Sequence, residues 1–233
     1  MHDPHAIGSA RYAVNEPVRT RVKICGCRSV NDVRNAIDAG ADAVGVIMAE
    51  SSPRRVSMED FRGIARFVPA LVPLVAVFVE PPASLVDEAL KAGAIPQFHG
   101  NEDAGWCESF APGPYLKAYH VRDEDPVTPE AFARFARAFE HATWLFDTAR
   151  AGGGSGGTGR TFAWEKLTAL GLQRAFVVSG GLTPENVGAC VQAVRPYAVD
   201  VSSGVETNGV KDRRKVLEFV RAVHDADAGV AAR

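Results

Sequence analysis

The feature that most constrains this chain is an eightfold alternation of a short apolar run with a longer amphipathic segment, which begins at residue 21. The apolar runs are rich in Val, Ile, Leu and Phe, as is typical of parallel strands covered on both faces. We expect strands at 21–25, 43–47, 74–78, 95–98, 115–119, 143–146, 175–179 and 198–201. Strands that alternate with helices form a parallel sheet with right-handed crossovers. Eight such units close most naturally into an α/β fold of one domain, the (β/α)8 or TIM barrel.

The segments between the predicted strands begin with helix-capping residues. Ser29 and Ser57 each precede a carboxylate by three positions, and Thr128 and Thr183 are each followed by proline, so all four are expected to cap helices. The alternative fold is an open doubly wound sheet. That fold usually carries G-x-G-x-x-G after its first strand, whereas Cys-Gly-Cys stands there in this chain.

Composition limits the partners of this protein. The 233 residues are 46% hydrophobic and 23% charged with a net charge of −2, so neither a nucleic-acid surface nor a membrane surface is expected. We expect residues 1–20 to form a flexible extension, 21–225 the barrel and 226–233 a tail. The four cysteines show no disulfide pattern and no second pair to complete a zinc site, which favours a cytoplasmic protein without a metal. We expect a monomer or a homodimer.

Glycine and serine cluster after the last three predicted strands. Active sites of such barrels lie at the carboxyl ends of the strands, and the loops after strands seven and eight commonly bind phosphate. Glycine lets the backbone approach an anion closely, and helix N-termini favour negative charge. The sequence therefore predicts a small phosphorylated ligand, with ligand contacts from Gly157, Gly159, Gly181, Ser202 and Ser203.

Two further strand ends carry candidate acid and base groups. Cys25 ends the first strand, where a helix N-terminus and nearby cations would lower a thiol pKa from about 8.5 toward neutrality and make it a general base. The alternative is a buried structural cysteine. Asp147 follows an apolar strand, where burial would raise its pKa and suit it to act as a general acid. The alternative is a cap or a salt-bridge partner for the next loop.

Side-chain parity adds four residues to this picture. Gln97 and His99 should face the same side, with His99 either a base or a packed, hydrogen-bonded histidine at the rim. Lys23 and Asp200 lie on the first and last strands, which are neighbours in a closed barrel. We therefore expect them to pair inside the barrel.

Arg54 follows the second predicted strand. Its guanidinium could bind a carboxylate through two hydrogen bonds, or it could be a solvated loop residue.

Taken together, these motifs resemble the phosphoribosylanthranilate isomerase family of tryptophan biosynthesis. The resemblance covers residues 21–225, in order, on every strand but the fifth. It rests on Lys23-Ile-Cys-Gly26, Gly40-Ala-Asp-Ala-Val-Gly45, Ser52-Pro-Arg54, Val77-Phe-Val79, Gln97-Phe-His-Gly100, Leu145-Phe-Asp147, Gly156-Gly-Thr-Gly159, Ser179-Gly-Gly-Leu182, Pro184-Glu-Asn186 and Val199-Asp-Val-Ser-Ser-Gly-Val-Glu206.

The resemblance implies an Amadori rearrangement that converts N-(5-phosphoribosyl)anthranilate to 1-(2-carboxyphenylamino)-1-deoxyribulose 5-phosphate. It implies that Asp147 protonates the ring oxygen, that Cys25 removes the C2 proton, and that Arg54 holds the anthranilate carboxylate. No metal or organic cofactor is implied. The chain departs from the family pattern at Arg28 and Arg55, which add positive charge near the site. This charge could lower the Cys25 pKa further, or it could mark an altered aromatic substrate.

Three other functions stay open at this point. A pentose-phosphate epimerase would need a metal held by histidines and aspartates, and an indole-glycerol-phosphate synthase would need lysines at strand ends. The sequence offers neither set plainly, since Lys117 is expected in mid-strand. A non-catalytic phosphate-binding or regulatory module would keep the loops and lose the acid and base.

Overall fold

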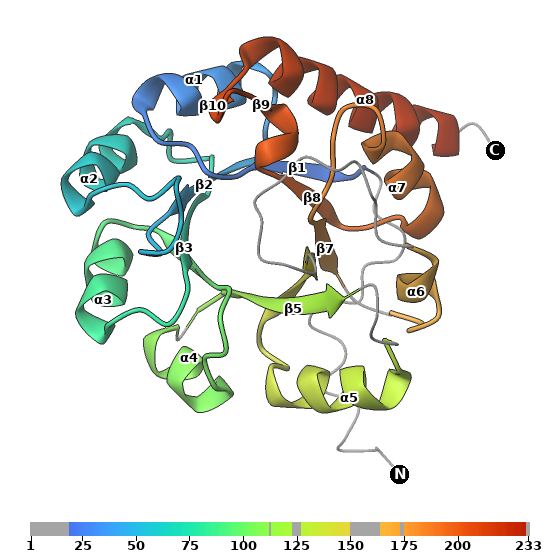
Figure 1. Ribbon diagram of the computed structural model, residues 1–233, viewed down its shortest axis with the longest axis horizontal. Helices are drawn as coiled ribbons and strands as arrows, with labels where there is room; N and C mark the ends of the chain where they lie inside the picture. Colours follow the sequence, from blue (N-terminus) through green and yellow to red (C-terminus); the bar gives the residue numbers. More distant parts are fainter. Residues whose placement is uncertain (1–18, 112, 123–126, 150–163, 173–174, 232–233) are drawn as a thin grey trace.

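The computed structural model describes residues 19–111, 113–122, 127–149, 164–172 and 175–231. Eight parallel strands form a closed barrel in chain order, which confirms the predicted fold (Figure 1). The strands are β1 Arg21–Ile24, β2 Ala43–Ile47, β3 Leu74–Phe78, β4 Ile95–Phe98, β5 Leu116–Arg122, β6 Thr143–Ala149, β7 Phe176–Ser179 and β8 Ala198–Val201.

Helices surround the barrel, as Figure 1 shows from the barrel end. They are α1 Val30–Asp38, α2 Met58–Phe67, α3 Ala83–Lys91, α4 Ala104–Phe110, α5 Pro129–Ala138, α6 Glu165–Thr168, α7 Val187–Val194 and α8 Arg213–Ala231. Ser29, Ser57 and Thr128 accept hydrogen bonds at the N-termini of α1, α2 and α5, as expected. Thr183 does not cap α7: this helix starts at Val187, because a turn held by the Thr183 carbonyl precedes it.

Two layers of side chains make the core. The larger apolar cluster lies between the barrel and the helices, while smaller clusters from alternate strand positions fill the barrel interior. β3 is buried at all five positions, which explains its unbroken apolar run. None of the helices among the described residues has the length and apolar character needed to cross a membrane.

The two ends of the barrel domain are tied together. The backbone N–H and hydroxyl of Thr20 donate to the carboxylate of Asp227 at 2.7 and 2.9 Å. The side chain of Ala226, also on α8, is buried. The expected tail at 226–233 therefore needs correction, because α8 continues to Ala231 and packs against the barrel. Of the expected extension at 1–20, residues 1–18 lie outside the described residues.

Candidate active site

An open cavity of about 370 Å³ lies at the carboxyl ends of the strands. Residues at the ends of every strand except β5 line it. The structure places these sequence-predicted residues around it: Cys25, Arg54, His99, Asp147, Gly181, Ser202 and Ser203. Gly157 and Gly159 lie outside the described residues. Cys25 and Asp147 come from β1 and β6, which are separated by β7 and β8, so their side chains enter the cavity from different sides.

Cys25 follows β1 and is buried, with 5% of its surface exposed. Its thiol shares a small space with Lys23, two residues earlier on the same face. Gly45 of β2 makes this space: a Cβ atom there would lie 2.8 Å from Cys25 Sγ and 3.1 Å from Lys23 Nζ. Lys23 pairs with Asp200 at the register position opposite it on β8, which confirms the predicted pair inside the barrel.

The expectation of a thiol pKa near neutrality is wrong. Burial raises the pKa of Cys25 above its ordinary value and outweighs the opposing charge of Lys23, while Asp200 raises it further. The helix α1 begins only at Val30, behind its Ser29 cap, so its N-terminus does not start at the thiol.

The two additional arginines do not alter this result. Arg28 donates to the carbonyl of Gly209 at 2.7 Å, and Arg55 pairs with Glu50 at 3.4 Å. Both side chains are engaged with exposed loop groups, and neither is among the residues that line the cavity. Neither arginine is among the groups whose charge shifts the pKa of Cys25.

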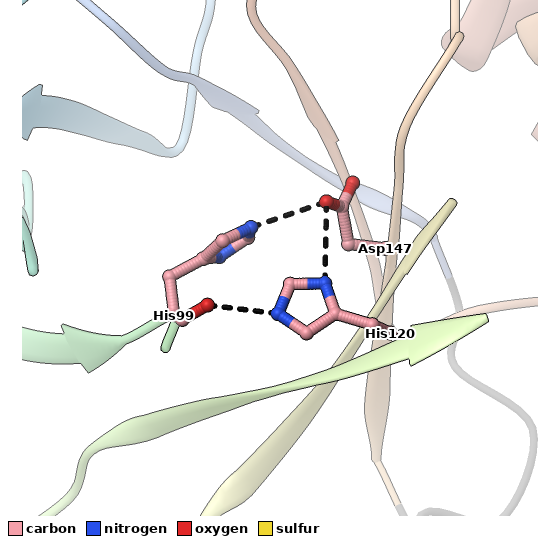
Figure 2. Close-up of side chains that lie close together, drawn as sticks. All are labelled: His99, His120 and Asp147. Atoms are coloured by element: carbon pink, nitrogen blue, oxygen red, sulfur yellow. Dashed lines mark hydrogen bonds and ion pairs between the residues drawn. The ribbon is translucent and has the colours of Figure 1, made fainter. Parts of the chain in front are cut away.

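Asp147 lies within β6 rather than after it, because β5 and β6 stay paired up to Arg122 and Ala149. Its side chain is 21% exposed, so the expected deep burial is not observed. One carboxylate oxygen, Oδ2, lies 3.1 Å from His99 Nε2 (Figure 2). Gln97 Nε2 lies 3.1 Å from the other ring nitrogen of His99. His99 is thus a hydrogen-bonded rim histidine that orients the carboxylate.

His120 is a member of this group that sequence reasoning did not single out for a role. It lies directly opposite Asp147 in the β5–β6 register, and its Nδ1 is 3.9 Å from Asp147 Oδ2. Its Nε2 is 2.8 Å from the carbonyl oxygen of His99. Burial and the neighbouring ring of His99 lower the pKa of His120. The parity of β5 is the only signal that could have pointed to it.

Arg54 is held by a carboxylate that the sequence analysis did not assign. Its Nε and Nη2 donate to Glu206 at 2.8 and 2.7 Å, which leaves Nη1 for a ligand. Glu206 also accepts from Lys211 at 2.7 Å. Burial opposes the charge of Glu206, but the hydrogen bonds from Arg54 and Lys211 outweigh it and keep the pKa of Glu206 below its usual value.

A short hairpin brings Lys211 to this position. Strands β9 Glu206–Thr207 and β10 Val210–Lys211 are antiparallel and joined by Asn208 and Gly209, both with positive φ. Asn-Gly is the strongest short-range signal for such a turn, and it could have revealed the hairpin from the sequence. Lys211 then donates to the carbonyl of Ser202 at 2.9 Å, so the hairpin also fixes the loop after β8.

The loops after β7 and β8 form a backbone cradle. Gly180 and Gly181 have φ values of 85° and 63°, a region that favours glycine. The amide of Asn186 donates to the carbonyl of Gly181 at 3.0 Å and fixes this loop. Gly204 packs so closely that a Cβ atom would lie 1.8 Å from the carbonyl oxygen of Leu182. Two adjacent loops are thereby held against one another at the cavity wall, where backbone N–H groups can bind an anion.

Comparison with known proteins places this site in a wider context. Residues 22–222 match a family described as N-(5'phosphoribosyl)anthranilate (PRA) isomerase. A protein named N-(5'-phosphoribosyl)anthranilate isomerase from Dechloromonas aromatica is 42% identical over 216 residues, with 91% of this chain and 100% of that protein covered.

Solved structures agree with this similarity. The phosphoribosyl anthranilate isomerase from Thermotoga maritima has a TM-score of 0.78 at 34% identity, covering 88% of this chain and 99% of that one. A second structure, of the isomerase in complex with reduced 1-(o-carboxyphenylamino)-1-deoxyribulose 5-phosphate, has a TM-score of 0.74 at 34% identity with the same coverage.

Proposed function

Because the chain belongs to the N-(5'-phosphoribosyl)anthranilate isomerase family, we propose that it catalyses that family's Amadori rearrangement in tryptophan biosynthesis. The substrate is N-(5-phosphoribosyl)anthranilate, and the product is 1-(2-carboxyphenylamino)-1-deoxyribulose 5-phosphate. The observation that carries the proposal is the shared cavity, in which a carboxyl and a thiol stand beside an arginine and a glycine- and serine-rich cradle.

Asp147 is the general acid of the proposed reaction. Its proton passes to the furanose ring oxygen, the bond from that oxygen to C1 breaks, and the anilino nitrogen forms an iminium with C1. His99 supports this step by holding Oδ2 in place at 3.1 Å. The partial exposure of Asp147 lets water return a proton to it between turnovers.

Cys25 is the general base. Its thiolate removes the C2 proton of the iminium, and the electron pair of that C–H bond flows toward the iminium to give an enol-amine. Protonation of C1 and loss of the hydroxyl proton at C2 then give the ketone. Since the Cys25 pKa is raised, only a minor fraction of the resting enzyme carries the thiolate, and Lys23 beside it stabilises that charge. The thiolate is therefore a strong base, although only a small fraction of the enzyme molecules carries it at neutral pH.

The two ends of the substrate have separate anchors. Nη1 of Arg54 faces the aromatic carboxylate, while the loops at Gly181 and at Ser202-Ser203 bind the phosphate, together with Gly157 and Gly159. These anchors would place C2 and the ring oxygen between the base that follows β1 and the acid on β6. One related isomerase is described as dimeric and has also been made monomeric. We propose a monomer or homodimer here.

The four free, buried cysteines support a cytoplasmic location for the protein.

A coupled fluorescence assay tests this proposal. An anthranilate phosphoribosyltransferase forms the unstable substrate in place from anthranilate and phosphoribosyl pyrophosphate, with pyrophosphatase present, and product is measured directly. We expect product only when the purified protein is added, and inhibition by the reduced product analogue. A folded protein that binds inorganic phosphate but forms no product above the enzyme-free control would contradict the proposal.

A further inference from the structure

Three potential metal ligands come together over β4, β5 and β6 (Figure 2), and two of them, His99 and Asp147, line the cavity. His99, His120 and Asp147 each offer one ligand atom, and these atoms all lie within 4.8 Å of one another. Their side chains are 23%, 35% and 21% exposed, so water and small ions can reach them. Because the three residues stand on adjacent, hydrogen-bonded strands or immediately after one, the scaffold that holds them is rigid.

Hydrogen bonding determines which nitrogen of His120 is available. Its Nε2 lies 2.8 Å from the carbonyl oxygen of His99, which can only accept, so Nε2 must carry the hydrogen. In the neutral ring Nδ1 then presents a lone pair toward Asp147 Oδ2, 3.9 Å away. That distance is too long for a direct hydrogen bond, and two acceptors face each other across it. A cation between these atoms would satisfy both.

His99 has the outer partner that metal-binding histidines use. Gln97 is 1% exposed and its amide lies 3.1 Å from His99 Nδ1, while Gln97 Oε1 has no hydrogen-bond partner among the described residues. Turning the amide end for end lets Oε1 accept from Nδ1–H. His99 Nε2 then presents a lone pair toward Asp147 Oδ2, 3.1 Å away, and a metal ion can take the place of the hydrogen between these two atoms. The buried amide oxygen of Gln97 would fix the ring orientation, as is usual around metal sites.

The spacing and chemistry of the ligands indicate the class of ion. Ligands bound at about 2.0–2.1 Å around a tetrahedral zinc ion lie about 3.3 Å apart. The two separations from Asp147 Oδ2, 3.1 and 3.9 Å, lie on either side of that value, and the three ligand atoms all lie within 4.8 Å, so the side chains would have to draw together slightly around an ion. Two imidazoles and a carboxylate suit Zn²⁺ or Co²⁺ rather than Mg²⁺ or Ca²⁺, which prefer all-oxygen sites. Three protein ligands would leave a fourth position of a tetrahedral ion for water.

From this geometry we propose that His99, His120 and Asp147 bind a divalent transition-metal ion of the zinc class, and that the bound ion inhibits the enzyme. The inhibitory part rests on the proposed function, in which Asp147 must deliver a proton. A metal-bound carboxylate has no proton to deliver, so occupancy removes the general acid without unfolding the site. No step of the proposed reaction uses the ion.

Binding is tested with Co²⁺ alone, titrated into chelator-treated full-length protein and monitored by its visible absorption. We expect one equivalent to bind, and H120A to weaken the affinity at least about tenfold, since loss of even an outer partner commonly costs that much. The matched control is H224A, an exposed histidine on α8 outside the cluster. Cys25→Ser should keep the signal. The proposal is overturned by absent saturation, by H120A binding like the parent, or by loss of the signal in Cys25→Ser.

Inhibition is tested separately, as the Zn²⁺ concentration that halves each variant's own rate in the isomerase assay. We expect a chelator to restore the parent's rate, and H120A to need at least about tenfold more Zn²⁺ than the parent or H224A. A metal-free protein that binds Co²⁺ but forms no product would reject the proposed function and keep the site. An active protein that binds no Co²⁺, or whose inhibition by Zn²⁺ is unchanged in H120A, would reject the site.

Discussion

The ammonium of Lys23 and the carboxylate of Asp200 lie 2.9 Å apart in the interior of the barrel, with 5% of each side chain exposed. Burial works against the charge of Lys23, but Asp200 and Cys25 together outweigh it and raise the pKa of the lysine. The ammonium of Lys23 therefore stays charged at neutral pH beneath the reacting thiol. This pair links the stability of the barrel to the electrostatics of the site.

Removing one member of the pair should destabilise the protein strongly. Lys23→Met leaves Asp200 buried without its partner, which typically costs about 3–5 kcal/mol in the free energy of unfolding. The double variant Lys23→Met/Asp200→Leu removes both charges and should recover much of that loss. Urea unfolding of the parent, both single variants and the double variant measures this. Equal losses in Lys23→Met and in the double variant would show that the charges do not stabilise one another.

The raised pKa of Cys25 predicts how the thiol reacts with pH. Below its pKa the group is protonated, so the thiolate fraction grows about tenfold per pH unit until the pKa is reached. We expect the rate of alkylation of Cys25 by iodoacetamide, measured by mass spectrometry of its peptide, to rise from pH 7 past the ordinary thiol range without levelling off. A plateau already reached at pH 7.5 would mean that the thiolate predominates at neutral pH and that burial does not control this group.

Two glycines should respond oppositely to alanine. Gly204→Ala would place a Cβ atom 1.8 Å from the backbone of Leu182 and force the loops after β7 and β8 apart, so we expect lower stability and a higher KM. In the helix α2, Gly63 is exposed with open space around its Cβ position, and Gly63→Ala should stabilise the protein by about 0.5–1 kcal/mol without changing KM. Thermal unfolding and steady-state kinetics test both. Identical behaviour of the two variants would contradict the described packing.

Glu206 should act as a positioning residue for Arg54. Glu206→Gln keeps the shape but removes the charge that holds Arg54 and Lys211, and we expect KM to rise at least about tenfold while kcat changes less. The lowered pKa of Glu206 means that its stabilising contribution is complete above the unfolded value of about 4.3 and is lost only on acidification below it. A fall in kcat with KM unchanged would argue against this positioning role.

Much of the fold could be predicted because two-sided burial leaves a strong signal in the sequence. Strands covered on both faces need apolar runs, so all eight begin within one residue of their expected start, and six of them begin at it. The Lys23–Asp200 pair followed from side-chain parity together with barrel closure. The prediction that Thr183 caps α7 failed for a local reason, because the chain makes a turn after Thr183 before the helix begins.

The site was harder to predict, since its details depend on burial and on contacts between distant residues. The fall in pKa expected for Cys25 assumed open surroundings, whereas desolvation inside the barrel dominates. Glu206 and Lys211 reach Arg54 and the Ser202 loop only because of the hairpin, which the sequence analysis did not include. His120 joins Asp147 through strand register, which no local pattern encodes.

The most direct test of the proposed chemistry is the turnover rate of Cys25→Ala and Asp147→Asn, each compared with the parent in the coupled fluorescence assay. General acid and base groups typically contribute about 10²–10⁴-fold. We predict that each variant folds and binds the reduced product analogue, yet loses at least about a hundredfold in kcat. Either variant turning over within about tenfold of the parent rate would contradict the assignment of that residue, and both doing so would contradict the proposed mechanism.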